Sequence, residues 1–257
     1  MDKDLDKKLT PKAGARFHYQ GRLGNGSEVR LNADAAHHAI RVLRLAVGEP
    51  VVLFDGYGGE FEAHITRIDR GQMSVKTGAH RDIERESRLQ LVLIQGLSSG
   101  DRMDITLQKA VELGVVTMQP VATERSVMKL KDERAQRRRE HWQNLVISAC
   151  EQCGRNRVPE VLPVLDFTDW LVQLSVAAPD NETRLLLSPA ADLQLKALQP
   201  PTRMLLLIGP EGGLSPVEMQ LAQSRGFRPV RLGPRVLRTE TAALAALSAI
   251  QALWGDF

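Results

Sequence analysis

The sequence contains few cysteines and few aromatic residues. Of its 257 residues, two are cysteine and 4% are aromatic. Two cysteines are too few for the disulfide framework of a small secreted domain. Cys150 and Cys153 form a C-x-x-C pair, but no further ligands at suitable spacing accompany it, so we expect no metal. Cys150 falls on the apolar face of a predicted helix and is interpreted as a buried structural residue.

Long apolar runs are also missing. No segment approaches the roughly 20 apolar residues that a membrane-spanning helix needs. The first residues, MDKDLDKK, are charged and contain no apolar signal region. We therefore expect a cytoplasmic protein that has no membrane partner.

Two phosphate-binding fingerprints are absent as well. The sequence contains no G-x-x-x-x-G-K-[ST], and no G-x-G-x-x-G follows a predicted strand. A nucleotide-dependent oxidoreductase is one alternative for a chain of this size, and the missing dinucleotide fingerprint argues against it.

Positive charge is concentrated in one part of the chain. The formal net charge is +3, yet residues 125–157 contain nine Lys or Arg and only four acids. A local basic stripe is what contact with nucleic-acid phosphates needs. A solvated helix face would give the same pattern, so charge alone leaves both interpretations open.

Up to about residue 78 the pattern is that of a small β-rich domain. A helix is expected from an N-cap at Asp34 through Leu45, ended by Gly48, and short strands are expected over residues 51–54, 61–68 and 72–77. Short strands at close spacing, separated by glycine turns, are typical of a small β-barrel. The charged segment 80–88 is expected to link a first domain, residues 1–80, to a second, residues 81–257.

From Leu89 onward, apolar strands alternate with helices. Such continuous apolar strands predict a parallel sheet with helices on both faces. Ser215-Pro216-Val217-Glu218 predicts a helix start with a capping box. The expected strands are 89–95, 115–121, 184–188, 204–208 and 229–232, and the expected helices begin at Asp101, Glu133, Ser215 and Thr239.

Three of these strands run directly into glycine or proline. The loops concerned are Ser188-Pro189, IGPEGG at 208–213 and LGPRVLR at 232–238. Ligands of open parallel sheets bind beyond the carboxyl ends of the strands. Glycine lets the backbone approach a ligand closely and proline stiffens the loop. Tight turns alone would explain each loop, but three together favour a binding site.

The motifs together carry a more specific signal. IGPEGG, a capped helix ending in RGF, and LGPRVLRTETA before a last helix resemble the SPOUT class of RNA methyltransferases. RFHYQGRL, HHAIRVLRLAVGEPVVLFDGYGGE, GDRMDITLQKAVELGV, TERSV and HWQNLVISACEQCGRNRVPEV are similar to the RsmE family within it. The resemblance runs from about Arg16 to Trp254.

The resemblance implies a fold, an activity and partners. The fold would be α/β: a parallel-sheet SPOUT domain with a C-terminal trefoil knot, preceded by a small PUA-like β-barrel domain. The protein would use S-adenosylmethionine (SAM) to methylate N3 of a uridine in 16S rRNA, the family target being U1498. It would be a homodimer acting on the small ribosomal subunit.

The resemblance also assigns cofactor contacts to the strand-end loops. The residues expected to frame SAM are Ser188, Ile208, Gly209, Pro210, Gly213, Leu232, Gly233, Leu237 and Thr241.

Three charged residues are candidates for the chemistry. Arg238 stands just before a helix, where a cation opposes the helix dipole, so we expect a role in stabilising negative charge on the uracil oxygens. Glu240 could accept the N3 proton. An acid in a first helical turn is also stabilising, and the two interpretations of Glu240 stay equal. Glu211 is expected to orient the ribose or the base.

RNA contacts are expected from basic residues. Arg16 and Arg22 are candidates by position only, in the family-like N-terminal stretch. Residues 155–157 follow a helix-ending glycine and are expected on an exposed loop. The candidates near the basic stripe are Arg125, Arg138, Arg155, Asn156 and Arg157.

Two further alternatives remain open. The same class of enzyme could act on another RNA nucleotide, because target choice depends on surface shape. A non-catalytic RNA-binding protein is the other alternative. The intact LGPRVLRTETA loop argues against it, and cofactor binding would distinguish the two.

Overall fold

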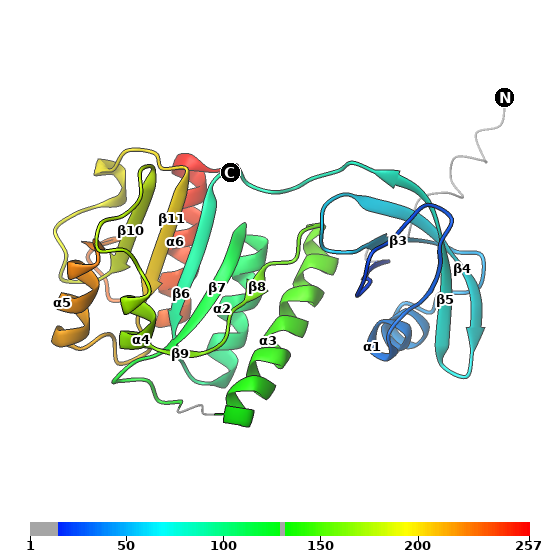
Figure 1. Ribbon diagram of the computed structural model, residues 1–257, viewed down its shortest axis with the longest axis horizontal. Coiled ribbons are helices and arrows are strands. Elements are labelled where there is room, and N and C mark those ends of the chain that lie inside the picture. Colours follow the sequence, from blue (N-terminus) through cyan, green and yellow to red (C-terminus); the bar gives the residue numbers. More distant parts are fainter. Residues whose placement is uncertain (1–14, 129–131) are drawn as a thin grey trace. The chain divides into compact units, whose positions relative to one another are not determined.

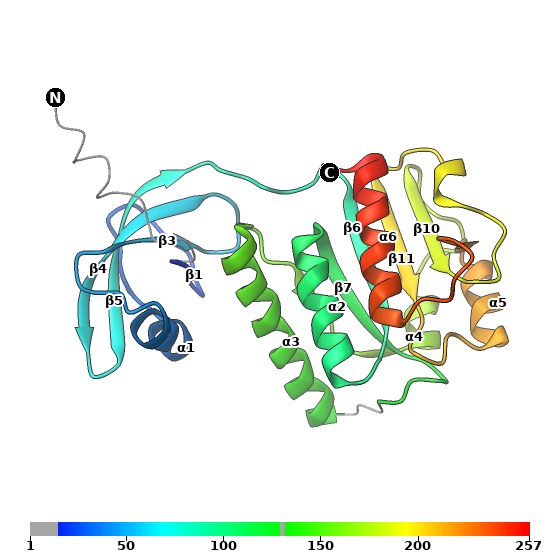
Figure 2. The same ribbon diagram turned by 180° about the vertical axis from the view of Figure 1, so that it is seen from behind.

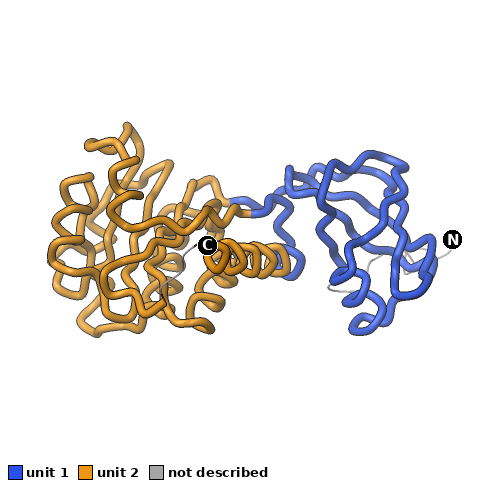
Figure 3. The backbone as a smooth tube through the Cα atoms, turned by 60° about the horizontal axis from the view of Figure 1, so that its bottom comes forward, with its two compact units in different colours: residues 1–86, 150–158 blue, residues 87–149, 159–257 orange. Residues whose placement is uncertain are grey.

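The computed structural model describes residues 15–128 and 132–257 of the chain. The chain separates into two compact units (Figure 3). The first unit contains the residues up to 86 together with 150–158, and the second contains 87–149 and 159–257. The first unit is therefore discontinuous in sequence. The division into functional domains at residue 80 stays a prediction.

The first unit is built on a mixed five-stranded sheet in the order β1-β3-β4-β5-β2. β1 pairs with β3 in parallel, and the other pairs are antiparallel. The core beside the sheet includes Phe17, Leu53 and Ile65, none more than 1% exposed. The strands are β1 (Arg16–His18), β2 (Glu28–Arg30), β3 (Pro50–Phe54), β4 (Glu60–Asp69) and β5 (Gln72–Arg81).

A short helix packs within this unit. α1 (Ala33–His37) continues as one turn of π-helix, η2 (His38–Val42). The prediction that Asp34 caps the helix is wrong, because the side chain of Asn32 accepts the hydrogen bond from the Ala35 amide. Asp34 instead lies in the first turn, where its charge suits the helix dipole.

The segment 150–158 is bound into the first unit by side-chain hydrogen bonds. Asn156 donates from Nδ2 to the Ile83 carbonyl at 2.6 Å and accepts from Arg16 at 2.6 Å. Arg155 forms an ion pair with Glu86 at 2.5 Å. Asn156 and Arg155 are 0% and 4% exposed. The prediction of an exposed loop is therefore wrong for both residues, since these bonds draw them inward, and holds for the exposed Arg157.

The second unit is a parallel α/β sheet, as predicted (Figure 1). Its strand order is β12-β10-β11-β6-β7-β8, with β9 also pairing with β7, and every pair is parallel. The strands are β6 (Gln90–Gly96), β7 (Val115–Ala122), β8 (Glu160–Val161), β9 (Leu165–Asp166), β10 (Glu182–Leu187), β11 (Arg203–Ile208) and β12 (Arg228–Val230).

Helices cover both faces of this sheet, which the views from the two sides show (Figures 1 and 2). Successive side chains of a strand point to opposite faces of the sheet, and in β11 the consecutive residues Leu205, Leu206 and Leu207 are all at most 4% exposed. Both faces are therefore apolar and need a helix layer. One face carries α2 (Gly100–Glu112), α3 (Asp132–Cys153) and α6 (Thr239–Trp254), and the other α4 (Phe167–Val172) and α5 (Pro216–Ser224). A single turn of 3-10 helix, η3 (Leu195–Ala197), precedes β11.

In the second unit the predicted helix starts agree with the structure to within one residue except at α2. α5 begins with the predicted capping box: the Ser215 side chain accepts from the Glu218 amide, and Glu218 accepts from the Ser215 amide. α6 begins at Thr239, as predicted. The N-cap of α2 is Ser99 rather than the predicted Asp101, which lies in the first turn.

Two backbone segments cross closely at the carboxyl end of β6. A Cβ added to Gly96 would lie 2.6 Å from Pro210 Cδ and 2.7 Å from Pro210 N. Only glycine allows the loop after β11 to pass at this distance. The trefoil knot itself stays a prediction.

Cys150 lies inside the protein, as predicted from its position on the apolar face of α3. Cys150 is buried, and its burial raises the pKa of the thiol to about 12. Within residues 15–128 and 132–257, no group of three or more His, Cys, Asp or Glu is placed to hold a metal ion. No helix in those ranges has the length and apolar character to cross a membrane.

Candidate active site

A cavity of about 610 Å³ lies in the second unit, at the carboxyl ends of β10, β11 and β12. Because these strands are parallel neighbours, their ends meet at one edge of the sheet, where ligands of such folds bind. We call it the strand-end cavity. Residues 187–189, 208–214, 230–233 and 235–239 form most of its wall, and Arg102, Arg125, Leu186, Met219 and Ala242 complete it.

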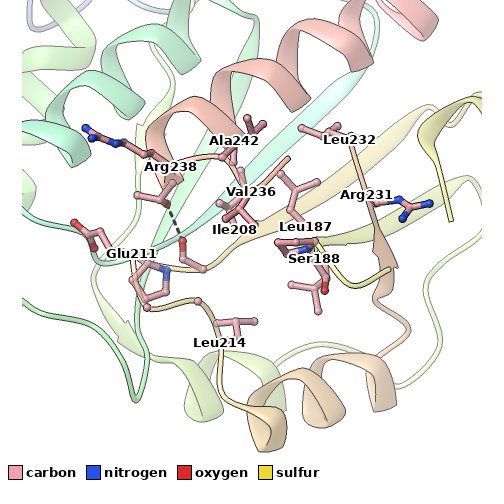
Figure 4. A pocket seen from close by; sticks show the side chains of 18 of the residues that line it. Leu187, Ser188, Ile208, Glu211, Leu214, Arg231, Leu232, Val236, Arg238 and Ala242 are labelled. Carbon is pink, nitrogen blue, oxygen red and sulfur yellow. Dashed lines mark hydrogen bonds between the residues drawn. The ribbon is translucent and has the colours of Figure 1, made fainter. Parts of the chain in front are cut away.

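The walls of the strand-end cavity are largely apolar (Figure 4). Leu187 and Ile208 come from the ends of β10 and β11, and Leu232 comes from the loop after β12. A Cβ added to Gly233 would meet no atom within 4 Å, so the wall stays open at this point. An apolar slot bordered by backbone amides and carbonyls suits a flat heterocycle such as adenine. These residues fit SAM.

Two side chains hold the loops of the cavity together. Thr239 donates from Oγ1 to the Gly209 carbonyl at 2.8 Å, which joins the start of α6 to the loop after β11 (Figure 4). Gln95, at the end of β6, donates to Thr239 Oγ1 at 3.1 Å. Gln95 and Thr239 are at most 6% exposed, so these hydrogen bonds are shielded from water.

The loop after β7 is fixed beside the cavity by the capping box of α5. Glu218 accepts a hydrogen bond from the Glu124 amide at 2.8 Å, in addition to its bond with Ser215. The next residue, Arg125, donates to the Gly212 carbonyl at 3.1 Å. The TERSV segment therefore borders the strand-end cavity.

Glu211 is bound to the start of α2. Its Oε1 accepts from the Ser99 amide at 2.9 Å, from the Ser99 hydroxyl at 2.8 Å and from Arg102 Nη1 at 2.9 Å. Partial burial raises the pKa of Glu211, but these hydrogen bonds outweigh it and hold the pKa below its ordinary value. Glu211 is thus an ionised residue that positions the loop after β11.

The other lining charges are positive. Arg102 forms an ion pair with Glu211, and Arg125 donates a hydrogen bond to the Gly212 carbonyl. The remaining lining arginines are Arg231, Arg235 and Arg238. Among the residues that line the cavity, Glu211 is the single acid, so the mouth attracts anions.

Arg238 lies at the rim of the cavity. It is the N-cap residue of α6, its side chain makes no capping hydrogen bond, and it is exposed. In Figure 4 its guanidinium points away from the apolar wall, on the same side as Glu211. A cation there is available to a ligand that enters from outside.

Glu240 and Thr241 do not line the strand-end cavity. Both border a smaller hollow of about 270 Å³, together with Ile105, Leu244, Ala245 and Ser248. Glu240 Oε1 lies 3.7 Å from Arg102 Nε. Its Oε2 is buried and has no hydrogen-bond partner among the residues that the structure describes.

Arg102, Thr239, Gln95 and Glu218 were not expected at the site. Arg102 follows β6, a neighbour of β11, so the rule that strand ends meet at one edge could have located it. Thr239 and Gln95 give no such signal, because their partners lie about 30 and 144 residues away. Glu218 was predicted as a cap, but its second bond, to residue 124, depends on the fold.

Some of the residues expected to contact RNA are buried or half-buried against other protein groups, and others are exposed to solvent. Arg16 binds Glu60, Gly154 and Asn156. Arg138 is half-buried beside Asp104 and Trp142. The exposed candidates are Arg22, Arg125 and Arg157.

The chain matches two family models. Residues 85–251 match the RNA methyltransferase domain, and residues 31–77 match the RNA methyltransferase PUA domain. The first match includes the whole strand-end cavity. The second falls on the mixed sheet of the first unit, which is the expected PUA-like domain.

Relatives match over nearly the full length. The ribosomal RNA small subunit methyltransferase E of Buchnera aphidicola from Schizaphis graminum is 34% identical over 89% of this chain and 92% of its own. The Bacillus subtilis protein of the same name is 31% identical over 86% of this chain and 88% of its own.

Solved structures match as well, and two of them contain the cofactor. The ribosomal RNA small subunit methyltransferase E of Neisseria gonorrhoeae, bound to S-adenosyl methionine, is 42% identical with a TM-score of 0.85, over 94% of this chain and 98% of that one. A Legionella pneumophila protein in complex with SAM is 38% identical with a TM-score of 0.89, over 95% and 99%. The chain therefore belongs to the RsmE family of RNA methyltransferases.

Proposed function

We propose that this protein transfers a methyl group from SAM to N3 of a uridine in the 16S rRNA of the small ribosomal subunit. The observation that carries the proposal is the strand-end cavity, which three parallel strands and their glycine-containing loops form in a chain of the RsmE family. The family target, U1498, is the proposed position.

The cavity supports the cofactor assignment residue by residue. Ser188, Ile208, Gly209, Pro210, Gly213, Leu232, Gly233 and Leu237 all line it. Thr241 does not, so we propose no cofactor contact for it. When bound, SAM supplies an electrophilic methyl group on a positively charged sulfur, which leaves as a neutral thioether.

Arg238 is the proposed electrostatic catalyst. When N3 of uracil loses its proton, negative charge is spread over N3 and the two neighbouring carbonyl oxygens, and this charge is neutralised as the N3 electron pair forms the new N–C bond to the methyl group. A guanidinium at the rim of the cavity can donate to such an oxygen and stabilise the charge where it develops. The free rim position of Arg238 supports this role.

Glu240 is the better candidate for the proton acceptor. Glu211 already accepts three hydrogen bonds on one oxygen, and its lowered pKa makes it a weaker base. Glu240 keeps one oxygen without a donor among the described residues. We propose that Glu240 receives the N3 proton and that Glu211 positions the loop.

The proposal also includes the oligomeric state and the location of the protein. The hollow that Ile105 and Leu244 share with Glu240 presents apolar surface next to the site, which supports a homodimer formed over α2 and α6. Light scattering of the purified protein tests that assembly. The cytoplasmic location stays a prediction.

The test of the function is a methyl-transfer assay. Small ribosomal subunits that lack the modification are incubated with the protein and labelled SAM, and the methylated nucleoside is identified by mass spectrometry. A 3-methyluridine at U1498 is expected. Another methylated nucleoside would show that the enzyme acts on a different target. A protein that does not bind SAM at all would favour the non-catalytic RNA-binding alternative.

A further inference from the structure

The turn between β3 and β4 in the first unit presents an exposed tyrosine. Its sequence is Asp55-Gly56-Tyr57-Gly58-Gly59, and Tyr57 is 56% exposed. The guanidinium carbon of Arg22 lies 3.4 Å from the centroid of the Tyr57 ring, so the cation covers one face of the ring. Large aromatic surface in water has no stabilising effect of its own, and an exposed cation–π pair adds little.

The turn holds Tyr57 rigidly. The Tyr57 amide donates to Asp55 Oδ1 at 3.2 Å, and the Gly59 amide donates to Glu84 at 2.6 Å. A Cβ on Gly58 would lie 2.7 Å from Arg157 Nη2, so the side chain of Arg157 packs directly against the turn. The tyrosine is therefore preorganised, which lowers the entropy lost when something binds to it.

Two arginines, Arg22 and Arg157, lie against the turn together with two acids, Asp55 and Glu84. Arg157 is exposed, and isolated β-bridges join its backbone to Gly56 and Tyr57. Glu84 already binds Arg157 and the Gly59 amide, and Asp55 accepts from the Tyr57 and Leu23 amides. Arg22 forms no ion pair with any residue that the structure describes. A planar aromatic surface with the Arg22 guanidinium on one face and the exposed Arg157 beside it matches single-stranded RNA, whose bases stack and whose phosphates need cations.

We propose that Arg22 and Tyr57 form a stacking platform for an unpaired nucleobase of the RNA substrate, with Arg157 beside it for a phosphate. The inference rests on the proposed function, because it requires that the substrate is RNA. It adds a base-binding site in the first unit, on residues separate from the strand-end cavity. A stack of this kind accepts any base, so the platform would contribute affinity rather than sequence choice.

The experiment measures RNA binding by the full-length protein. The probe is a fluorescently labelled single-stranded oligouridylate, into which the protein is titrated at several salt concentrations. Tyr57→Ala should weaken binding by roughly tenfold, the effect of losing one stacked base, and should leave the salt slope unchanged because no charge is lost. Tyr57→Phe keeps the ring and should bind like the wild type. Tyr57→Leu keeps apolar bulk without a ring and should behave like Tyr57→Ala.

Arg22 provides a second, independent variant. Arg22→Lys keeps the charge but loses the planar stacking surface, so it should weaken binding with an unchanged salt slope. Val47→Ala is the matched control, since Val47 is 58% exposed in the same unit and lies outside the turn. Thermal unfolding of each variant shows whether its fold is intact.

The outcomes separate this proposal from the function on which it rests. If Tyr57→Ala or Tyr57→Leu binds the RNA as tightly as the wild type, the platform is overturned. In that case, methylation of small subunits by the wild type would still support the proposed function. A wild type that neither binds RNA nor methylates it would overturn both. Loss of binding in Tyr57→Ala with recovery in Tyr57→Phe would support the platform.

Discussion

At the scale of single residues, Arg102 connects the parts of the site. Its guanidinium binds Glu211 at 2.9 Å and lies 3.7 Å from Glu240. Glu211 belongs to the loop after β11, and Glu240 belongs to the first turn of α6. One side chain therefore sets the positions of two acids that the sequence singled out separately. Arg102 acts through these acids and is a positioning residue.

Arg238→Ala should slow methyl transfer without weakening the binding of SAM. We expect kcat to fall by about 10²- to 10³-fold, the usual effect of losing one donor to developing negative charge. The Kd for SAM, measured by calorimetry, should stay near the wild-type value. Arg228→Ala is the control, because Arg228 is exposed, does not line the cavity and should leave kcat nearly unchanged. Equal turnover in Arg238→Ala and the wild type would remove Arg238 from the mechanism.

Glu60 makes the stability of the first unit depend on pH. Burial raises the pKa of this carboxyl, but Arg16 at 2.5 Å and Arg85 at 3.3 Å outweigh it and hold the pKa below the ordinary value of 4.5. A depressed folded-state pKa means that the unfolded chain binds the proton first as the pH falls. The stabilisation is therefore present above pH 4.5 and is lost as the pH falls through the lower folded pKa.

Glu60→Gln should abolish that pH dependence. At neutral pH the variant should be less stable by roughly 1–3 kcal/mol, because charged hydrogen bonds from Arg16 and Arg85 become weaker. Below about pH 4 the difference from the wild type should shrink, which urea unfolding at several pH values measures. A constant difference at every pH would contradict this assignment.

At the scale of elements, the site depends on how closely loops pass each other. Gly96 ends β6 where Pro210 crosses it, and Thr239 binds Gly209 from the start of α6. These contacts join segments that follow three different strands. The shape of the cavity therefore depends on the close packing of these crossing segments.

Two glycine variants separate folding from binding. Gly96→Ala should cost about 1–3 kcal/mol or more, because its Cβ would lie 2.6 Å from Pro210 Cδ and the backbone would have to move. Gly233→Ala meets no protein atom within 4 Å, so its stability should match the wild type. The added methyl group would instead occupy space in the cavity wall and weaken SAM binding.

Thermal unfolding and SAM titration of both variants check this pair. The interpretation of the crossing fails if Gly96→Ala unfolds at the wild-type temperature. The interpretation of the wall fails if Gly233→Ala binds SAM as tightly as the wild type.

At the scale of the whole molecule, the two units are interleaved in the sequence. Residues 150–158 leave the second unit, bind in the first, and return. Every residue that lines the strand-end cavity belongs to the second unit. Ligand binding should therefore stabilise the second unit directly.

SAM at about 100 times its Kd should stabilise the folded protein by roughly 2.7 kcal/mol, since it binds only the folded state. Hydrogen exchange should show the added protection in residues 208–214 and 231–239. The strands β4 and β5 of the first unit should change little. Protection that appears mainly in β4 and β5 would place the cofactor elsewhere.

Local patterns determined much of this protein in advance. Continuous apolar strands alternating with helices determined the parallel sheet, because only burial on both faces accommodates strands without a polar side. The capping box at Ser215 was also local, since a cap needs only residues within one turn. Strand-end glycines located the cavity because parallel strands end at one edge.

The tertiary structure alone decided which side chains meet. It placed Asn156 and Arg155 inside the first unit, although their position after a helix-ending glycine predicted exposure. It joined Arg102 to Glu211 across 109 residues and Thr239 to Gln95 across 144. Sequence patterns follow the periods of single helices and strands, whereas such contacts depend on where whole elements pack. The fold of the second unit was thus determined locally, and the electrostatics of its site were determined by packing.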